Sequence, residues 1–333
     1  MLDVVALGEL LIDFAPVSTD AAGYPTLAAQ PGGAPGNFLV ALQKYGCTTA
    51  LIGKVGADRF GELLKATLAE KGIGTRGIVA DPAVFTTLAF VTLDATGNRA
   101  FSFARKPGAD TCLRADEVDT ALIDEARVFH FGSLSLTDEP ARAATRAAVA
   151  HAETEVGAID ILINNSGVST TERLVDVTEE NYDYVFDTNT RGAFFVAQAV
   201  AKRMLARAKG SAPGTFTGGR IVNIASAAGL RTMPQIGVYC MSKAAVVHMT
   251  KVMAGEWGRF GITTNAVCPG YIDTEINHHH WGTEGGQKLI EMLPRKRVGQ
   301  PKDLDALVVM LCSAQSDFIN GAIISADDGM VAA

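Results

Sequence analysis

The sequence predicts an α/β protein with a three-layer, Rossmann-like parallel sheet. Short apolar segments alternate with helical ones along the chain, as in TALIGKVG (49–56) followed by ADRFGELLKATLAEKG (57–72). This alternation is typical of strand–helix–strand units, whose strands run parallel. Residues 221–224 (IVNI) are apolar at three of four positions, and such a run predicts a strand. At 333 residues the chain is long enough for about two domains.

The first half predicts a regular succession of elements. A buried strand over 3–14 ends on Asp13, and glycines and prolines then form a turn before a helix. Further along, apolar and polar residues alternate on both sides of Ala95-Thr96-Gly97-Asn98, which predicts a β-hairpin. The other predicted elements are a helix over 36–45, a strand over 49–56, a helix closed by Gly72, a short helix over 115–125, a strand over 128–134 and an alanine-rich helix over 138–156.

The second half predicts a strand over 160–165, a long helix over 179–208 and a second helix over 237–256. Between the helices, the composition of GSAPGTFTGG (210–219) indicates a flexible loop. The strand 221–224 then delivers Ser226 to its carboxyl end. The remaining predicted elements are a segment over 271–290 after a Pro-Gly turn, a turn and helix start over 293–304, and a last strand and turn over 324–330.

Composition excludes several classes of partner. Net charge of −7 argues against nucleic acid and against an anionic membrane surface. The start, MLDVVALGELLIDF, lacks the basic region of a signal peptide, and no apolar run reaches the ~18 residues of a membrane span. The five cysteines are odd in number, scattered and without C-x-x-C spacing, so we expect a reduced, cytoplasmic location.

Chemistry concentrates in the stretch from Ile221 to Lys243. Tyr239 and Lys243 lie four residues apart and share one face of the predicted helix. A free phenol titrates near pH ~10 and transfers protons poorly at neutral pH, and a nearby ammonium lowers its pKa. Ser226 can hydrogen-bond the same substrate oxygen. These three residues suit proton transfer to a carbonyl/alcohol pair, whereas Tyr-x-x-x-Lys alone would fit any solvated helix face.

Flanking motifs resemble the short-chain dehydrogenase/reductase family over about residues 150–333. DILINNSG (160–167) is similar to that family's Asn-Asn-Ala-Gly motif, with Ser166 in place of alanine. FDTNTRGAFF carries Asn189 where the family has the asparagine of its Asn-Ser-Tyr-Lys tetrad. NAVCPGYIDT (265–274) is similar to the strand and Pro-Gly turn beside the nicotinamide.

The resemblance implies NAD or NADP as cofactor, and the residues do not reveal which. It implies Tyr239 as acid/base, Lys243 as the ligand of the nicotinamide ribose, and Asn189 as the anchor of a water-linked proton relay. The residues that it implies at the nicotinamide end are Asn164, Tyr239, Lys243, Ile272 and Thr274. It also implies a homo-oligomer through the helices over 179–208 and 237–256, and a lid over 271–290.

That predicted lid contains His278-His279-His280. A metal site is one interpretation of three histidines. Side chains of adjacent residues diverge, however, so they do not converge on one ion, and we predict no metal.

The first half resembles the amino-terminal part of ribokinase-like (PfkB-type) sugar kinases. The likeness rests on Gly-Gly-Ala-Pro-Gly-Asn (32–37) and GKVGADRFGELL (53–64), with Leu39 where the family has a small residue. It implies that sugar hydroxyls are held by Asp13, Gly32, Gly33 and Asn37, and that the hairpin is a lid over the sugar. The alternative is that the glycines only make a tight turn.

Each resemblance lacks a part. The kinase family's Gly-Ala-Gly-Asp loop, which supplies the anion hole and the base, has no counterpart in the carboxyl-terminal half, so we expect no phosphoryl transfer. The reductase family's Gly-x-x-x-Gly-x-Gly turn, which cradles the cofactor pyrophosphate, has none either. The sequence therefore predicts two partial proteins joined within 141–157, with domains at 1–150 and 151–333. Residues 160–165 could continue the first half's sheet through a right-handed crossover.

The leading hypothesis is a short-chain-type oxidoreductase that acts on a hydroxyl/carbonyl pair of a small molecule, impaired by the absent pyrophosphate cradle. The alternatives are a sugar-binding module without kinase activity and an inactive fusion. Substrate identity, cofactor preference and reaction direction are not readable from the residues.

Overall fold

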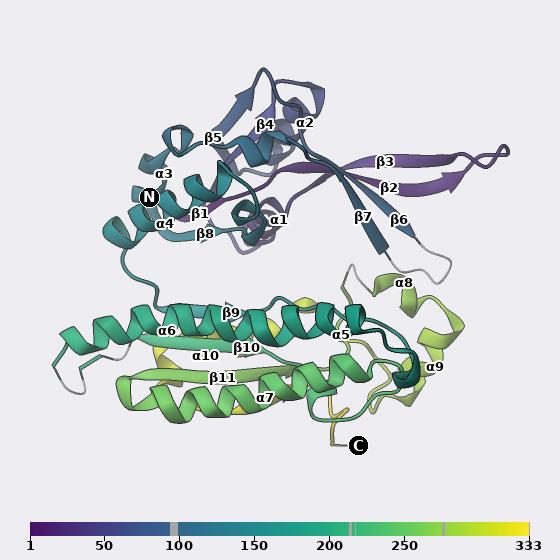
Figure 1. Ribbon diagram of the computed structural model, residues 1–333, viewed down its shortest axis with the longest axis vertical. Helices are drawn as coiled ribbons and strands as arrows, with labels where there is room; N and C mark the ends of the chain where they lie inside the picture. The colour runs from purple at the N-terminus through teal and green to yellow at the C-terminus, as the bar shows by residue number, and fades with distance from the viewer. Residues whose placement is uncertain (94–98, 213–214, 217, 275–276, 333) are drawn as a thin grey trace. The chain divides into compact units, whose positions relative to one another are not determined.

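The computed structural model describes the chain except for 94–98, 213–214, 217, 275–276 and 333 (Figure 1). It divides into two compact units, Met1–Ala158 and Ile159–Ala333. Each unit holds its own parallel sheet between helices, so the predicted α/β class with Rossmann-like parallel sheets is confirmed. No helix in the described part of the chain combines the length and the apolar character needed to cross a bilayer.

The sheet of the first unit has four parallel strands in the order β5-β4-β1-β8. The strands are β1 (Leu2–Leu7), β4 (Thr49–Gly56), β5 (Gly74–Asp81) and β8 (Ala126–Phe131). The helices are α1 (Ala34–Gln43), α2 (Arg59–Glu70), α3 (Thr120–Asp124) and α4 (Ala141–Glu155). Alternate residues of β1 pack on opposite layers: Ala6 lies with α1 and α2, and Val5 with α3 and α4.

A second, four-stranded sheet in this unit has the order β3-β2-β6-β7. It consists of β2 (Leu11–Thr19), β3 (Pro25–Gly32), β6 (Leu88–Leu93) and β7 (Arg99–Ala104). Strands β6 and β7 are the predicted hairpin, whose turn at 95–98 lies outside the described residues. The small predicted hairpin is therefore only half of this sheet.

The prediction of one strand over 3–14 is wrong, because β1 ends at Leu7 and β2 begins at Leu11. The residues between the two strands, Gly8 and Glu9, contact the start of α1. A Cβ on Gly8 would lie 2.4 Å from Pro35 Cγ, and the Glu9 carboxylate accepts a hydrogen bond from the Ala34 N–H at 3.1 Å. Asp13 consequently lies inside β2 and not at the end of the first strand.

The second unit has a parallel sheet in the order β12-β11-β10-β9. Its strands are β9 (Ile161–Asn164), β10 (Gly219–Ile224), β11 (Ile262–Pro269) and β12 (Ile323–Ala326). Strand β9 pairs with β10 from Ile161↔Arg220 to Asn164↔Asn223, in a sheet separate from that of β1. The expected continuation of the first sheet through 160–165 is therefore wrong, since this strand finds its neighbour within the second unit.

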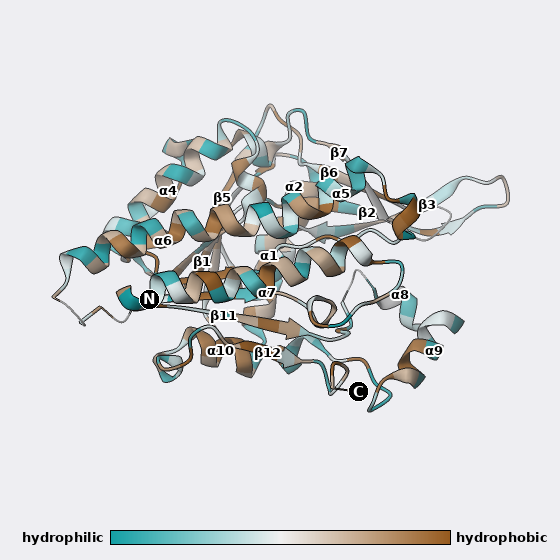
Figure 2. Cartoon of the chain, turned by 60° about the horizontal axis from the view of Figure 1, so that its bottom comes forward, coloured by the Kyte–Doolittle hydropathy of each residue, from teal (hydrophilic) through white to brown (hydrophobic). Residues whose placement is uncertain are grey.

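Helices cover both faces of this sheet. Met204 of α6 (Ala193–Gly210) packs on Ile221, and Leu311 of α10 (Asp305–Cys312) packs on Val222. On the α6 side, α7 (Gly237–Trp257) adds Val246. Figure 2 shows hydrophobic residues along β11, α7 and α10. The other helices are α5 (Glu179–Phe186), α8 (His278–Trp281) and α9 (Glu284–Met292).

The long helix predicted over 179–208 is interrupted. Asp187–Gly192 forms a π-helical segment between α5 and α6, which inserts a wider turn around Asn189. Sequence periodicity could not reveal it, because the apolar pattern continues through both flanking helices.

Candidate active site

Ser226 and Tyr239 meet at the carboxyl end of β10. Ser226 follows the strand and begins a short 3₁₀ turn, where its Oγ accepts the Ala228 N–H at 3.1 Å. Tyr239 lies in the first turn of α7. Burial raises the pKa of Tyr239, and a side-chain hydrogen bond with Ser226 acts in the opposite direction. The structure thus brings these two hydroxyl groups together, as the sequence predicted.

Lys243 lies one turn after Tyr239 and is only 4% exposed. Its Nζ donates to the Ile224 carbonyl at 2.9 Å and lies 5.7 Å from the centroid of the Tyr239 ring. Burial lowers the pKa of Lys243 to about 8. From the sequence we expected the Lys243 ammonium to lower the pKa of the Tyr239 phenol. In the structure the ammonium is bound to the Ile224 carbonyl. The pKa of Tyr239 is raised, because the effect of burial exceeds that of the hydrogen bond with Ser226.

Asn189 uses its amide group to join three segments. Its Oδ1 accepts the Val168 N–H at 2.8 Å, and its Nδ2 donates to the Val168 carbonyl at 2.9 Å and to Ser242 Oγ at 3.0 Å. The side chain is 1% exposed. The π segment therefore ties the loop after β9 to α7, beside the lysine.

Gly167, the last residue of the Asn-Asn-Ser-Gly motif, approaches Lys243 closely. A Cβ there would lie 3.2 Å from Nζ and 3.5 Å from Asn189 Oδ1. A side chain at this position would therefore crowd the ammonium group.

The three remaining predicted cofactor residues are held by other polar groups. Asn164 Nδ2 donates to Asn223 Oδ1 at 2.9 Å and to the Ala193 carbonyl at 3.2 Å. The side chain of Asn277 binds the segment after the Pro-Gly turn, with Nδ2 on the Ile272 carbonyl at 2.8 Å and Oδ1 on the Thr274 N–H at 2.8 Å. Of the three histidines considered above as a metal site, His278 and His279 have side chains that the structure does not describe.

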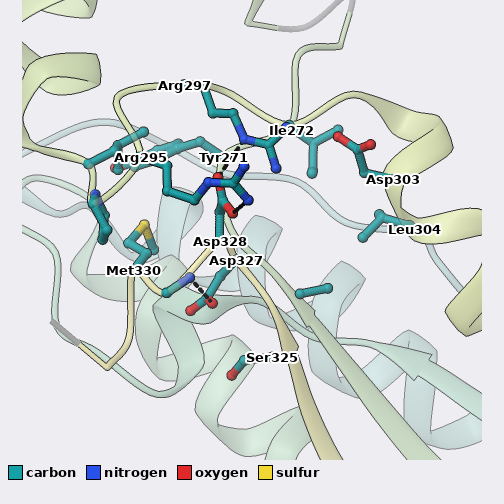
Figure 3. Close-up of a pocket in the computed structure, with 15 residues that line it drawn as sticks. Tyr271, Ile272, Arg295, Arg297, Asp303, Leu304, Ser325, Asp327, Asp328 and Met330 are labelled. Atoms are coloured by element: carbon teal, nitrogen blue, oxygen red, sulfur yellow. Dashed lines mark hydrogen bonds and ion pairs between the residues drawn. The ribbon is translucent and has the colours of Figure 1, made fainter.

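A pocket of about 300 Å³ adjoins this segment at the carboxyl ends of β11 and β12 (Figure 3). It is lined by parts of 271–272, 293–299, 303–304 and 325–330. Reasoning from sequence missed it, because its walls come from four separate segments. Ile272 lines it, but Ser226, Tyr239 and Lys243 are not among its lining residues.

In the first unit, the predicted sugar-binding residues gather at the junction of β3 and α1. Gly33 has φ of 115°, and a Cβ there would lie 2.4 Å from the Glu9 carbonyl oxygen, so only glycine fits without strain. A Cβ on Gly32 would meet the Asp13 carboxylate on the neighbouring strand. Asn37 is exposed in the first turn of α1, where its N–H bonds the Gly33 carbonyl at 3.0 Å.

Comparison with known proteins finds two family matches, which overlap over residues 133–203. Residues 1–203 match the family described as pfkB family carbohydrate kinase, and residues 133–331 match the family described as Enoyl-(Acyl carrier protein) reductase. Fructokinase-1 of Zea mays is 46% identical over 158 residues, which are 47% of this chain and 49% of that protein. The chain thus spans about half the length of the fructokinases that it matches.

Relatives of the second part are dehydrogenases. The 2-dehydro-3-deoxy-D-gluconate 5-dehydrogenase of Dickeya dadantii (strain 3937) is 34% identical over 201 residues, 60% of this chain and 76% of that protein. The solved structure of 4-hydroxyisoleucine dehydrogenase complexed with NADH has a TM-score of 0.52 and 28% identity, covering 62% of this chain and 80% of that one. The chain therefore belongs to two families, the pfkB carbohydrate kinases in its first part and the short-chain reductases in its second.

Proposed function

We propose that the second unit is a short-chain-type oxidoreductase that interconverts a secondary hydroxyl and a carbonyl. The observation that carries the proposal is the contact between Ser226 and Tyr239 at the end of β10, one helical turn from the buried Lys243. In the reducing direction Tyr239 gives its hydroxyl proton to the carbonyl oxygen, and in the oxidising direction the phenolate takes it back. Ser226 holds the same oxygen by a hydrogen bond.

A nicotinamide cofactor, when bound, supplies or accepts the hydride. The Lys243 ammonium, which no side chain of Gly167 crowds, would bind a ribose hydroxyl of that cofactor. Asn189 positions this lysine indirectly, since it clamps the loop just after Gly167, at Val168, to α7. The named substrates of the dehydrogenase relatives favour a small polyhydroxylated or hydroxylated acid as substrate class. Preference for NAD or NADP stays open.

The test is reduction of such compounds with NADH and with NADPH, followed at 340 nm, in the native chain and in Tyr239→Phe. The variant keeps the ring but lacks the transferable proton, so we expect the rate to fall by about 10²–10⁴-fold. Tyr182→Phe is the matched control, because that ring lies on α5 and is 40% exposed. A Tyr239→Phe rate equal to the native rate would remove Tyr239 from the mechanism.

A second candidate function rests on the first unit. Asp13, Gly32, Gly33 and Asn37 lie around one junction, and 158 residues of the chain are 46% identical to a fructokinase, which favours sugar binding. The missing Gly-Ala-Gly-Asp loop is what argues against phosphoryl transfer. Titration with D-fructose tests it, with Asp13→Ala as the variant expected to lose binding. The same titration separates this candidate from an inactive fusion, which would bind neither sugar nor nucleotide.

A further inference from the structure

The pocket at the ends of β11 and β12 carries two arginines on one wall. Arg295 Nη1 lies 2.9 Å from Asp328 Oδ1, and Arg297 Nε lies 2.6 Å from Asp328 Oδ2 (Figure 3). One carboxylate is thus shared between two guanidinium groups, so these three side chains carry a net charge of +1, although Asp303 and Asp327 bring the formal charge of the whole lining to −1. A guanidinium has five N–H donors, and the described contacts of each arginine with Asp328 use one of them.

Asp328 is fixed in a backbone conformation that few residues adopt. Its φ is 55°, in the left-handed region, where aspartate is tolerated better than most side chains. The two arginines lower the pKa of this carboxyl group, so it stays ionised at neutral pH. Both guanidinium groups remain accessible, with exposed fractions of 66% for Arg295 and 49% for Arg297.

The other two carboxylates of the pocket are anchored by backbone groups. Asp327 accepts the N–H groups of Gly329 at 3.1 Å and Val331 at 2.8 Å. Asp303 accepts the Gln300 N–H at 2.8 Å. A carboxylate has about four lone-pair sites, so each keeps capacity to accept hydrogen bonds from hydroxyl groups.

The rest of the lining is apolar. Leu293, Pro294, Leu304, Ala326 and Met330 contribute hydrocarbon surface between the charged groups. At about 300 Å³ the pocket has the size of a site for a small molecule. The pocket therefore offers positive charge at one wall, hydrogen-bond acceptors elsewhere, and apolar contact between them.

We propose that this pocket binds a small carboxylic acid that carries several hydroxyl groups. Its carboxylate lies against Arg295 and Arg297, its hydroxyl groups donate to Asp303 and Asp327, and its carbon chain packs on the apolar lining. The site is distinct from the group around Tyr239, and binding at it requires no oxidoreductase activity.

Calorimetry with D-xylonate and with xylitol tests the proposal, because the two differ in a carboxylate against a hydroxymethyl group. We expect xylonate to bind at least ten times more tightly than xylitol to the native chain. Arg297→Gln should weaken xylonate binding about tenfold or more, and Asp328→Asn should strengthen it, because it removes the competing internal carboxylate. Arg173→Gln is the control, since Arg173 pairs with Asp176 on an exposed surface outside the pocket.

Loss of binding through misfolding is excluded by the double variant Arg297→Gln/Asp328→Asn. It removes one charge of each sign, and it should keep the native unfolding midpoint while binding xylonate more weakly than Asp328→Asn alone. Tyr239→Phe should leave xylonate binding unchanged, which separates failure here from failure of the proposed oxidoreductase function. Equal affinity for the two compounds, no binding of xylonate, or unchanged binding by Arg297→Gln would each overturn the proposal, and so would a tenfold loss in Tyr239→Phe.

Discussion

Lys243→Met should stabilise the second unit at neutral pH while it abolishes oxidoreductase activity. Burial lowers the pKa of Lys243 from 10.5 to about 8. That difference corresponds to about 3 kcal/mol by which the folded state disfavours the charged lysine at pH 7. Methionine of similar length avoids this penalty but loses the hydrogen bond to the Ile224 carbonyl, which contributes about 1 kcal/mol. The variant should therefore be more stable by about 2 kcal/mol.

The sign of the pH dependence follows from proton linkage. Between pH 8 and 10.5 the unfolded chain binds more protons at this lysine than the folded chain does, so native stability rises with pH there. At pH 9.5 the penalty falls to about 1 kcal/mol, and the advantage of the variant should nearly vanish.

Urea unfolding followed by tryptophan fluorescence measures the free energy of unfolding of the second unit, because both tryptophans, Trp257 and Trp281, lie in it. Lys251→Met on the same helix is the matched control, since Lys251 is exposed and its replacement should change stability by less than about 0.5 kcal/mol. A Lys243→Met variant that is less stable at pH 7, or whose advantage does not shrink towards pH 9.5, would refute the reasoning.

Three further outcomes are expected. Without a recognisable pyrophosphate cradle, NADH and NADPH should bind in the millimolar range, about 4 kcal/mol weaker than micromolar binding, and calorimetry that gave a micromolar constant would point to an unrecognised phosphate site. No sugar in a coupled ATP assay should be phosphorylated, and turnover that Asp13→Ala abolishes would contradict this. Asp58→Ala should destabilise the first unit by about 2–4 kcal/mol, because the Asp58 carboxylate accepts four hydrogen bonds at the start of α2. The donors are the N–H groups of Phe60, Gly61 and Thr86 and the Thr86 hydroxyl. Amide hydrogen exchange in α2 of the variant that matches the native rate would rule this out.

Much of the candidate site could be predicted because its residues lie close together in the sequence. The order of strand, Ser226, loop, Tyr239 and Lys243 lies within one short stretch, and the strand–loop–helix that it predicts is present. Strand β4 (Thr49–Gly56) likewise matches its predicted range, because an apolar run with a following capped helix is a local signal.

The features that were missed depend on contacts between distant residues. Lys54 in β4 is 2% exposed and forms ion pairs with Asp81 at 2.8 Å and Glu117 at 2.9 Å. The positions of these residues in the sequence do not indicate that they pair. The charged wall of the pocket joins Arg295 and Arg297 to Asp328, more than 30 residues later. The break between β1 and β2 falls at Gly8 and Glu9, and their contacts with Pro35 and Ala34 at the start of α1 are not visible in the sequence.

The π segment at Asp187–Gly192 makes the number of residues, and not only their identity, important for the second unit. Each helical residue turns the chain by about 100°. Deleting one residue between Asn189 and α6 would rotate Ala201 and Met204 away from the sheet on which they pack. Restoring that packing would instead pull Asn189 from Val168 and Ser242. An insertion or deletion in this segment should therefore disturb the second unit more than a substitution on its exposed side.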